Sequence, residues 1–221
     1  MPEPRCAGCY DATFDAAKAR AEVRRYRRRG PTRATLALAD ALGRKGVEGR
    51  TILDIGAGVG ALHHVLLARG AIAAIDVDAS GPYLAAAREE ADRLGFADRV
   101  KYVYGDFVAL APDVEPADLV GLDRVVCCYR DVDALVRVAA AHTRRRLGIV
   151  LPPDGLAART FIRLVNLWYR LIRSPYRAYV HPYDRVVAAA RSGGLDPAGA
   201  SAIGVWRLLV FERPILTSDT P

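Results

Sequence analysis

Three aspartates follow short apolar runs of the sequence, and a glycine-rich turn follows the first of them. The acids are Asp54, Asp76 and Asp106, and the glycines are Gly56, Gly58 and Gly60. Glycine lets backbone N–H groups come close to a bound nucleoside or phosphate, because a Cβ there would collide with the ligand. A second acid about twenty residues further on can accept hydrogen bonds from ribose hydroxyls. The spacing therefore predicts a nucleoside-binding turn with a ribose-binding carboxylate.

Short runs rich in β-branched residues must position these acids. Residues 51–55, 72–76 and 99–104 have the length and composition of buried parallel strands, separated by segments of helical periodicity. This alternation predicts βαβ units, in which the carboxyl ends of the strands form one edge of a sheet. The turn from Gly56 to Ala61 also fits the relaxed dinucleotide pattern G-x-G-x-x-G/A, and the first two acids do not discriminate between the two kinds of ligand.

Three motifs in order resemble those of the class I S-adenosylmethionine-dependent methyltransferases. Residues 53–60 read Leu-Asp-Ile-Gly-Ala-Gly-Val-Gly like the first motif of that family, residues 75–78 resemble the second, and Gly105-Asp106-Phe107 resembles the adenine-binding corner. The resemblance covers roughly residues 51–150 and favours this family over dinucleotide enzymes. It implies S-adenosylmethionine as the cofactor. It also implies a Rossmann-like, doubly wound, mostly parallel seven-stranded sheet with helices on both faces.

The resemblance further implies roles for single residues. Asp54 and the glycine turn would hold the methionine part, Asp76 would accept from both ribose hydroxyls, and Asp106 would accept from the adenine amino group while Phe107 packs on its ring. Further positions implied in cofactor binding are Val77, Leu122 and Asp123. A sulfonium methyl group is already activated, so no metal is required and the protein mainly holds the reacting atoms in line.

The methyl acceptor is predicted to be a small acidic or aromatic molecule, with O-methylation favoured. For a phenol or hydroxyl acceptor, His181 is the candidate general base and Tyr129 an orienting donor. A carboxylate acceptor would need no base, because it is anionic at neutral pH. An alternative is an RNA- or membrane-docking protein whose Rossmann-like domain binds the cofactor for regulation.

A narrower resemblance lies beyond the fourth predicted strand. Leu122-Asp123, Cys128-Tyr129 and Tyr179-Val180-His181 are similar to the magnesium-protoporphyrin O-methyltransferase branch of the class I enzymes. The chain departs from that branch at Cys128, where the branch tends to have a histidine. The N-terminal Cys-x-x-Cys and the arginine cluster at residues 24–29 also lie outside its pattern.

Length and composition favour one well-buried α/β domain, since the chain has 221 residues, of which 52% are hydrophobic. We expect an N-terminal cap of helices over residues 1–46 and a methyltransferase domain over 47–221 with a helical insert at 155–178. No run is long enough to span a bilayer, and no signal peptide is recognised, so we expect a cytoplasmic protein. The net charge of +7 favours acidic partners such as carboxylated small molecules, nucleic acid or an anionic membrane face, without choosing among them. Without an appended RNA-binding motif we expect a small anionic acceptor and no nucleic acid, and the sequence predicts no oligomeric state.

Two further residue classes invite functional readings. Cys6, Cys9, Cys127 and Cys128 are expected to be reduced thiols, with a shared metal or redox site as the alternative. His63 and His64 are expected to be partly exposed surface residues rather than ligands. In the insert, an apolar stripe lies opposite several arginines; this pattern fits an ordinary amphipathic helix, a substrate lid or a membrane-contacting helix.

Overall fold

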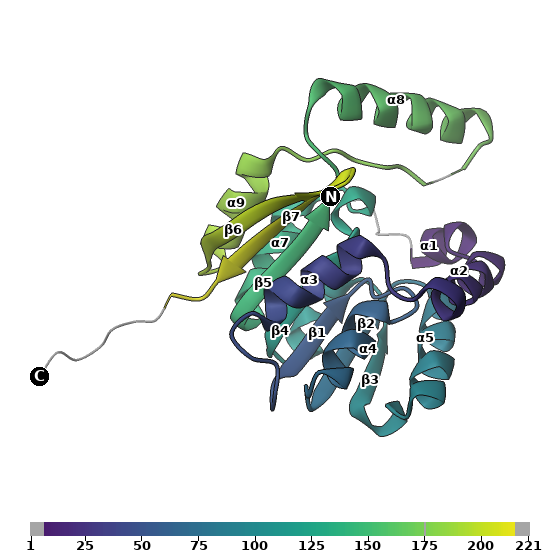
Figure 1. Ribbon diagram of the computed structural model, residues 1–221. Helices are drawn as coiled ribbons and strands as arrows, with labels where there is room; N and C mark the ends of the chain where they lie inside the picture. The colour runs from purple at the N-terminus through teal and green to yellow at the C-terminus, as the bar shows by residue number, and fades with distance from the viewer. Residues whose placement is uncertain (1–6, 175, 215–221) are drawn as a thin grey trace, which may run out of the picture.

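A seven-stranded sheet forms the centre of the molecule (Figure 1). The computed structural model describes residues 7–174 and 176–214, with side chains described from Tyr10 onward. The strand order is β3-β2-β1-β4-β5-β7-β6. Strands β1 to β5 pair in parallel, and β7 runs antiparallel between β5 and β6. The predicted doubly wound, mostly parallel sheet is therefore confirmed.

The strand bounds place the predicted acids at or near one edge. The strands are β1 Thr51–Ile55, β2 Ala73–Asp78, β3 Val100–Tyr104, β4 Ala117–Asp123, β5 Thr143–Leu151, β6 Asp196–Ile203 and β7 Trp206–Glu212. The chain winds outward from β1 to β3 and then crosses back to β4, so the order reverses between β1 and β4. In open α/β sheets a crevice for ligands forms at the carboxyl ends of the strands beside such a switch point.

Helices cover both faces of the sheet. On one face, α3 Arg33–Gly43, α4 Ala61–Ala68 and α5 Gly81–Leu94 pack against the side chains of Ile52 and Ala74. On the other face, α6 Phe107–Leu110, α7 Val132–Ala141 and α9 Tyr183–Ser192 enclose a second core around Leu53 and Ile149. At the N-terminal end, α1 Ala7–Thr13 and α2 Ala16–Arg29 lie beside α5 (Figure 1).

Side-chain caps explain where several helices begin. Asp15 accepts from the backbone N–H of Lys18 at 2.9 Å, and Thr32 accepts from that of Thr35 at 3.1 Å. Asp131 does the same for Ala134 at the start of α7. These caps occupy donors that have no partner inside the helix. Helices α2, α3 and α7 therefore begin directly after the residues whose side chains cap them.

Helix α8, Leu156–Leu171, stands apart from the body of the domain (Figure 1). None of its residues is fully buried. The return segment at residues 176–180 holds it by one side: the Asn166 side chain donates to the backbone oxygen of Ala178 at 2.8 Å and accepts from its N–H at 2.9 Å. Among the described residues, no helix is long and apolar enough to span a membrane.

Candidate functional site

A cavity of about 270 Å³ opens at the carboxyl ends of β1, β2 and β4. Of the predicted site residues, its wall contains Gly56, Gly58, Val77, Asp106, Phe107, Asp123 and Tyr129. The wall does not contain Asp54, Gly60, Asp76, Leu122 or His181. The structure thus gathers most of the predicted residues around one space and leaves five of them outside it.

The turn after β1 has the backbone conformation that its glycines allow. Gly56 and Gly58 have φ values of 65° and 59°, which side chains rarely adopt. A Cβ on Gly56 would lie 2.6 Å from a methyl carbon of Val125, which also lines the cavity. The Gly56 N–H donates to the Val77 carbonyl at 2.7 Å, which fixes the turn against the end of β2.

Two acids on β2 have different positions. Asp78 lines the cavity, and its carboxylate accepts from the N–H groups of Gly58 at 3.0 Å and Ser80 at 2.8 Å. Burial raises the pKa of Asp78 to about 6, although these two N–H donors oppose the shift. Asp76 is fully buried, and neither of its carboxyl oxygens has a hydrogen-bond partner among the described residues.

Asp78, and not Asp76, is therefore the acid of β2 that a ligand in the cavity can contact. The two side chains share a face of β2, but Asp76 lies two residues, about 7 Å, further from the carboxyl edge. Helices α4 and α5 cover it there, so a ligand in the cavity does not reach it.

Asp54 also lies beneath the glycine turn and pairs with Asp76 across β1 and β2. Its carboxyl group lies 2.9 Å from Nδ1 of His63, and both side chains are essentially inaccessible to solvent. Burial, followed by the charge of Asp123, raises the pKa of Asp54 to about 8. At neutral pH Asp54 is therefore protonated and can donate to His63. The structure does not bring Asp54 to the cavity, where the sequence resemblance placed it.

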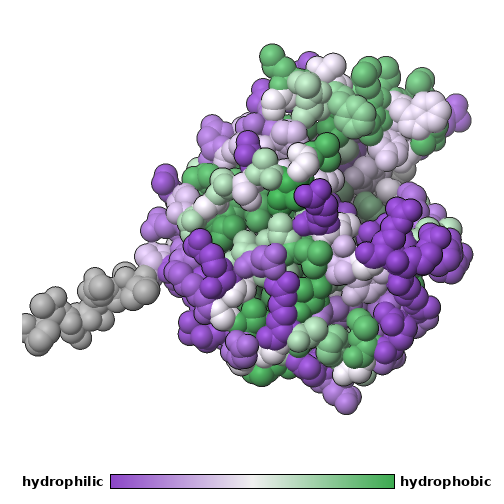
Figure 2. Space-filling view, in the orientation of Figure 1, coloured by the Kyte–Doolittle hydropathy of each residue, from purple (hydrophilic) through white to green (hydrophobic). Residues whose placement is uncertain are grey.

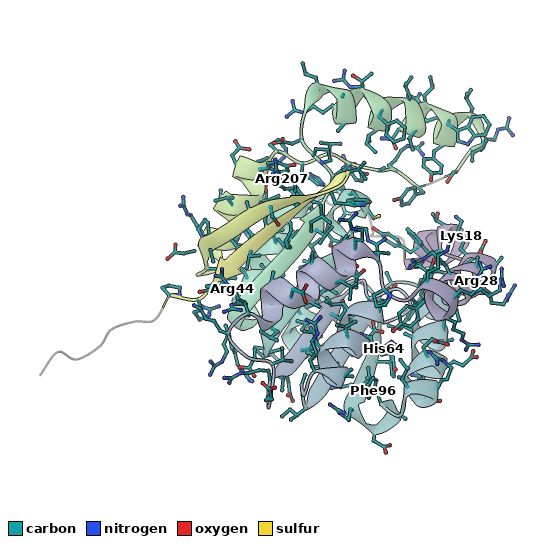
Figure 3. The ribbon with its side chains drawn as sticks, viewed as in Figure 1. Lys18, Arg28, Arg44, His64, Phe96 and Arg207 are labelled. Atoms are coloured by element: carbon teal, nitrogen blue, oxygen red, sulfur yellow. The ribbon has the colours of Figure 1, made fainter. Side chains whose placement is uncertain are left out.

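The expectation that His63 and His64 are partly exposed is wrong, because they are 0% and 2% exposed. Their rings contact edge to face, with centroids 4.5 Å apart. His64 is also enclosed by the rings of Tyr26 and Phe96, the second of which lies next to it in Figure 3. Burial lowers the pKa of each histidine to about 3.

Gly60 owes its identity to these histidines and not to a ligand. It precedes α4 with a φ of 79°, and a Cβ there would lie 2.6 Å from Nε2 of His63 and 2.8 Å from Cε1 of His64. Asp54, Asp76, His63 and His64 form what we call the buried polar layer. It supports the glycine turn from the side opposite the cavity.

Above the turn, two predicted residues are joined by a hydrogen bond. The Tyr129 hydroxyl donates to the Asp106 carboxylate, with distances of 2.9 and 3.0 Å to its two oxygens. The Val108 N–H also donates to Asp106, which caps α6. Phe107 is buried beside them with its ring against His142. A carboxylate has about four acceptor positions, so Asp106 can still accept from a ligand amino group.

At the end of β4, Asp123 lines the cavity while Leu122 does not. Leu122 is fully buried in the core beneath the sheet. Asp123 accepts from the Thr35 hydroxyl at 2.6 Å and forms a two-pronged ion pair with Arg124, at 2.9 and 3.0 Å. Arg124 adopts a φ of 64° and also lines the cavity.

His181 lies behind Tyr129 and outside the cavity wall. It is 7% exposed, and its Nε2 lies 2.9 Å from the backbone oxygen of Tyr129. A carbonyl oxygen can only accept, so Nε2 carries the proton. Burial lowers the pKa of His181, partly offset by this bond. The structure gives His181 a contact that orients the loop at Tyr129 and does not bring it to the predicted acceptor site.

The N-terminal helices supply cavity residues that sequence analysis missed. Tyr10 lies in α1 and Phe14 directly after it, and Glu22 and Arg25 come from α2. Tyr83 from α5 lies among them, with its hydroxyl donating to Glu22 at 2.9 Å. These residues come from segments without a glycine motif. The one signal in the sequence is the aromatic pair Tyr10 and Phe14 ahead of a helix, and no pattern distinguishes Arg25 from the arginines beside it.

Comparison with known proteins identifies the segment that builds this cavity. Residues 52–146 match the family model described as a methyltransferase domain. A 93-residue stretch is 33% identical to the ribosomal protein L11 methyltransferase of Enterobacter sp. (strain 638), covering 42% of this chain and 30% of that protein. The chain therefore spans less than a third of the curated relative that it matches.

Solved structures share the arrangement of strands and helices. The magnesium protoporphyrin IX methyltransferase of Synechocystis PCC 6803 with bound SAH has a TM-score of 0.65 and 21% identity, covering 82% of each chain. An O-methyltransferase family protein from Burkholderia thailandensis has a TM-score of 0.70 and 20% identity, covering 92% of this chain and 62% of the other. The chain therefore has the fold of these methyltransferases, and residues 52–146 match a methyltransferase domain.

The cysteines of the methyltransferase domain lie at its cavity. Cys128 lines the wall, with its Sγ 2.9 Å from the Tyr176 hydroxyl and 3.8 Å from the Sγ of Cys127. The hydrogen bond from Cys127 lowers the pKa of the Cys128 thiol, against the effect of burial. Cys6 lies outside the described residues and the Cys9 side chain is not described, so a four-thiol site stays a prediction. No group of three or more described His, Cys, Asp or Glu side chains could hold a metal.

Proposed function

We propose that the chain transfers the methyl group of S-adenosylmethionine to a small anionic acceptor. One observation supports this most strongly: Asp78 is held on the Gly58 N–H and faces the cavity, inside the segment that matches the methyltransferase family model. The donor set fits an adenosyl ligand. It offers a turn whose glycines let the backbone approach a ligand, a carboxylate for two hydroxyls, and an acid next to an aromatic ring.

Residues of the cavity then have distinct tasks in binding. The backbone from Gly56 to Gly58 faces the methionine part, Asp78 accepts from the ribose hydroxyls, and Asp106 accepts from the adenine amino group beside Phe107. When bound, the cofactor supplies a methyl group already activated on a sulfonium. Holding the reacting atoms in line is an orientation effect worth up to roughly 7–11 kcal/mol. Tyr10 and Phe14 from the N-terminal cap lie on the cavity wall and restrict the access of water.

Within the described part of the chain, the cavity wall has no free group that could take a proton from the acceptor, which supports an acceptor that is already an anion when it binds. Each carboxylate on the wall already has a donor: Glu22 has Tyr83, Asp78 has Gly58, Asp106 has Tyr129 and Asp123 has Arg124. No histidine among the described residues lines the wall. A carboxylate, or a hydroxyl acidic enough to ionise in the site, needs no base. Methylation of oxygen on such a molecule is the reaction that these contacts favour.

Arg25 is the cation that we assign to the acceptor's negative charge. It lines the cavity and forms no ion pair with another described residue, whereas Arg124 is already neutralised by Asp123. An arginine can bind a carboxylate through two parallel hydrogen bonds. The acceptor and the cofactor's own methionine group both carry a carboxylate, so the assignment must be tested against both.

Two measurements test the function and the role of Arg25 separately. Calorimetry should show micromolar binding of S-adenosylmethionine, and incubation of cell extract with labelled cofactor should identify a methylated product by mass spectrometry. In Arg25→Gln the KM for that acceptor should rise more than tenfold while cofactor affinity stays within threefold; Arg24→Gln on the same helix is the control. A parallel loss of cofactor affinity would assign Arg25 to the methionine carboxylate instead.

The alternative is a protein that docks on RNA or a membrane and binds the cofactor only for regulation. The exposed apolar face of α8 supports docking. The cavity, whose wall carboxylates all accept hydrogen bonds from the protein, supports catalysis. A purified protein that binds the cofactor but methylates nothing in the extract would favour the regulatory alternative.

A further inference from the structure

The outer side of α8 carries a stripe of large apolar side chains that no described residue covers. Phe161, Leu164, Trp168 and Leu171 recur at spacings of three and four residues, and each is between 60% and 70% exposed. In Figure 2 hydrophobic residues gather along this helix at the top of the view. Single exposed apolar residues are normal on protein surfaces, but a continuous stripe marks a binding surface.

The fold does not need this stripe. The other side of α8 faces the return segment at residues 176–180. There the Asn166 side chain hydrogen-bonds the Ala178 backbone, and the ring centroids of Tyr169 and Tyr176 lie 5.1 Å apart. Ile162 and Val165 are half-buried on that inner side. The helix is therefore attached by one side, and the stripe points away from the domain.

The charges on α8 and the residues after it all have one sign. Arg159, Arg163, Arg170 and Arg173 occur within residues 156–173, and that range contains no aspartate or glutamate. None of the four forms an ion pair with another described residue. Their positions lie on the face of the helix opposite the apolar stripe. The partner that covers the stripe must accordingly offer both an apolar interior and negative charge at its surface.

We propose that α8 docks the protein on an anionic lipid surface. A helix with Trp, Phe and Leu on one face and cations as its only charges inserts its apolar side at the boundary of headgroups and acyl chains. Anionic headgroups attract the arginines of the polar face, which supply the electrostatic part of the binding. A second copy docked through the stripe would leave the arginines without an acidic partner, and RNA would leave the apolar stripe in water.

A second exposed apolar residue lies at the same end of the sheet. Leu151 at the end of β5 pairs with Arg207, so the turn between β6 and β7 lies beside the point from which α8 departs. Val205 in that turn is 76% exposed. Val205 is therefore a further exposed apolar side chain near the start of α8.

The docking face is connected to the cavity wall. From α8, Tyr169 contacts Tyr176, whose ring meets Phe14 at 5.6 Å and whose hydroxyl bonds Cys128. Phe14 and Cys128 both line the cavity. Resting on the proposed function, docking would present the cavity to amphiphilic acids that partition into the membrane surface.

Vesicle binding of the full chain tests the proposal without any assay of methyl transfer. The probes are phosphatidylcholine vesicles with and without phosphatidylglycerol. In a Trp206→Phe background Trp168 is the single tryptophan, and its fluorescence should shift to the blue and be quenched by brominated lipid only with anionic vesicles. Binding equal to both vesicle types, or to neither, would overturn the proposal.

Variants separate the apolar and the charged contributions. Leu164→Glu with Leu171→Glu should abolish binding, while Ile72→Glu, at a 56% exposed position before β2, should leave it unchanged. Arg163→Gln with Arg170→Gln should weaken binding about 25-fold, at about fivefold for each charge. Cofactor affinity should be unchanged in all of them. A concentration-dependent dimer that Leu164→Glu dissolves, with no vesicle binding, would assign the stripe to a second copy and overturn the proposal.

Discussion

The two sides of the glycine turn carry similar residue types with opposite properties. Above the turn, Asp78 and Asp106 face the cavity, and each is held by hydrogen bonds from the protein. Below it, Asp54 and Asp76 are fully buried, and one carboxyl oxygen of Asp54 and both of Asp76 have no partner among the described residues. The difference shows that depth along a strand, and not residue type, decides whether an acid can bind a ligand or only shapes the interior.

The largest expected difference is between the two acids of β2. Asp78→Ala should weaken S-adenosylmethionine binding by about 3 kcal/mol, because two hydrogen bonds to a charged carboxylate are lost. Asp76→Asn should leave the affinity within threefold, since Asp76 does not line the cavity. Calorimetry at pH 7.5 on both variants gives the comparison. The reverse order of effects would return the ribose to Asp76.

The next effect concerns the support of the turn from below. Gly60→Ala should lower the free energy of unfolding by about 2 kcal/mol more than Gly95→Ala. Both residues have positive φ, but only at Gly60 would the new Cβ meet the rings of His63 and His64, whereas no atom lies within 4 Å at Gly95. Urea unfolding measures both variants. Equal losses of unfolding free energy in the two variants would mean that backbone strain alone matters and that the rings of His63 and His64 move aside.

The buried polar layer also predicts a loss of stability at mildly alkaline pH. The folded pKa of Asp54 is about 8 and that of Asp76 is raised well above 3.8, so the folded state holds protons that the unfolded state releases. His63 and His64, with pKa values of about 3, act in the opposite direction only below their unfolded value of 6.5. Above pH 6.5 only the carboxyls still differ between the two states.

Their contribution to stability is therefore lost as pH rises from 6.5 through 8, at about 1.4 kcal/mol per pH unit for Asp54. Denaturant unfolding at pH 6.5 and 8.5 should show this decline, and Asp54→Asn should flatten it. A wild-type free energy of unfolding that stays level over this range would contradict the neutral state of the layer.

The smallest expected effect lies above the turn. Tyr129→Phe removes one donor from Asp106 and should lower the free energy of unfolding by about 1 kcal/mol, with a change of less than fivefold in cofactor affinity. Tyr104→Phe removes a comparable bond to Asp11 at a 48% exposed position outside the cavity wall and serves as the control. A loss of affinity beyond tenfold would show that Tyr129 contacts the ligand itself.

Sequence reasoning recovered the strands, the glycine turn and the order of the motifs because these depend on local periodicity and on backbone geometry. It named Asp76 and not Asp78, the acid that lines the cavity, because both residues end the same apolar run and the pattern does not show where the covering helices stop. It placed His63 and His64 at the surface because histidine is often exposed. The short α4 is instead enclosed by the sheet on one side and by Tyr26 and Phe96 on the other.

The upper wall of the cavity depended on contacts that no motif encodes. Helix α1 has no apolar periodicity, yet Tyr10 and Phe14 at its end reach the cavity. Arg25 belongs to a run of arginines that a helix dipole already explains, so nothing in the sequence separated it from its neighbours. Long-range packing, and not local pattern, selected these residues.

The double hydrogen bond between Asn166 and the Ala178 backbone has a mechanical consequence. It fixes α8 to the return segment at residues 176–180, so the helix and this segment move as one rigid unit. The N–H of Tyr179 in the same segment donates to the Cys127 carbonyl. A displacement of α8 is therefore transmitted to the rim of the cavity where methylation is proposed, without any unwinding of the helix.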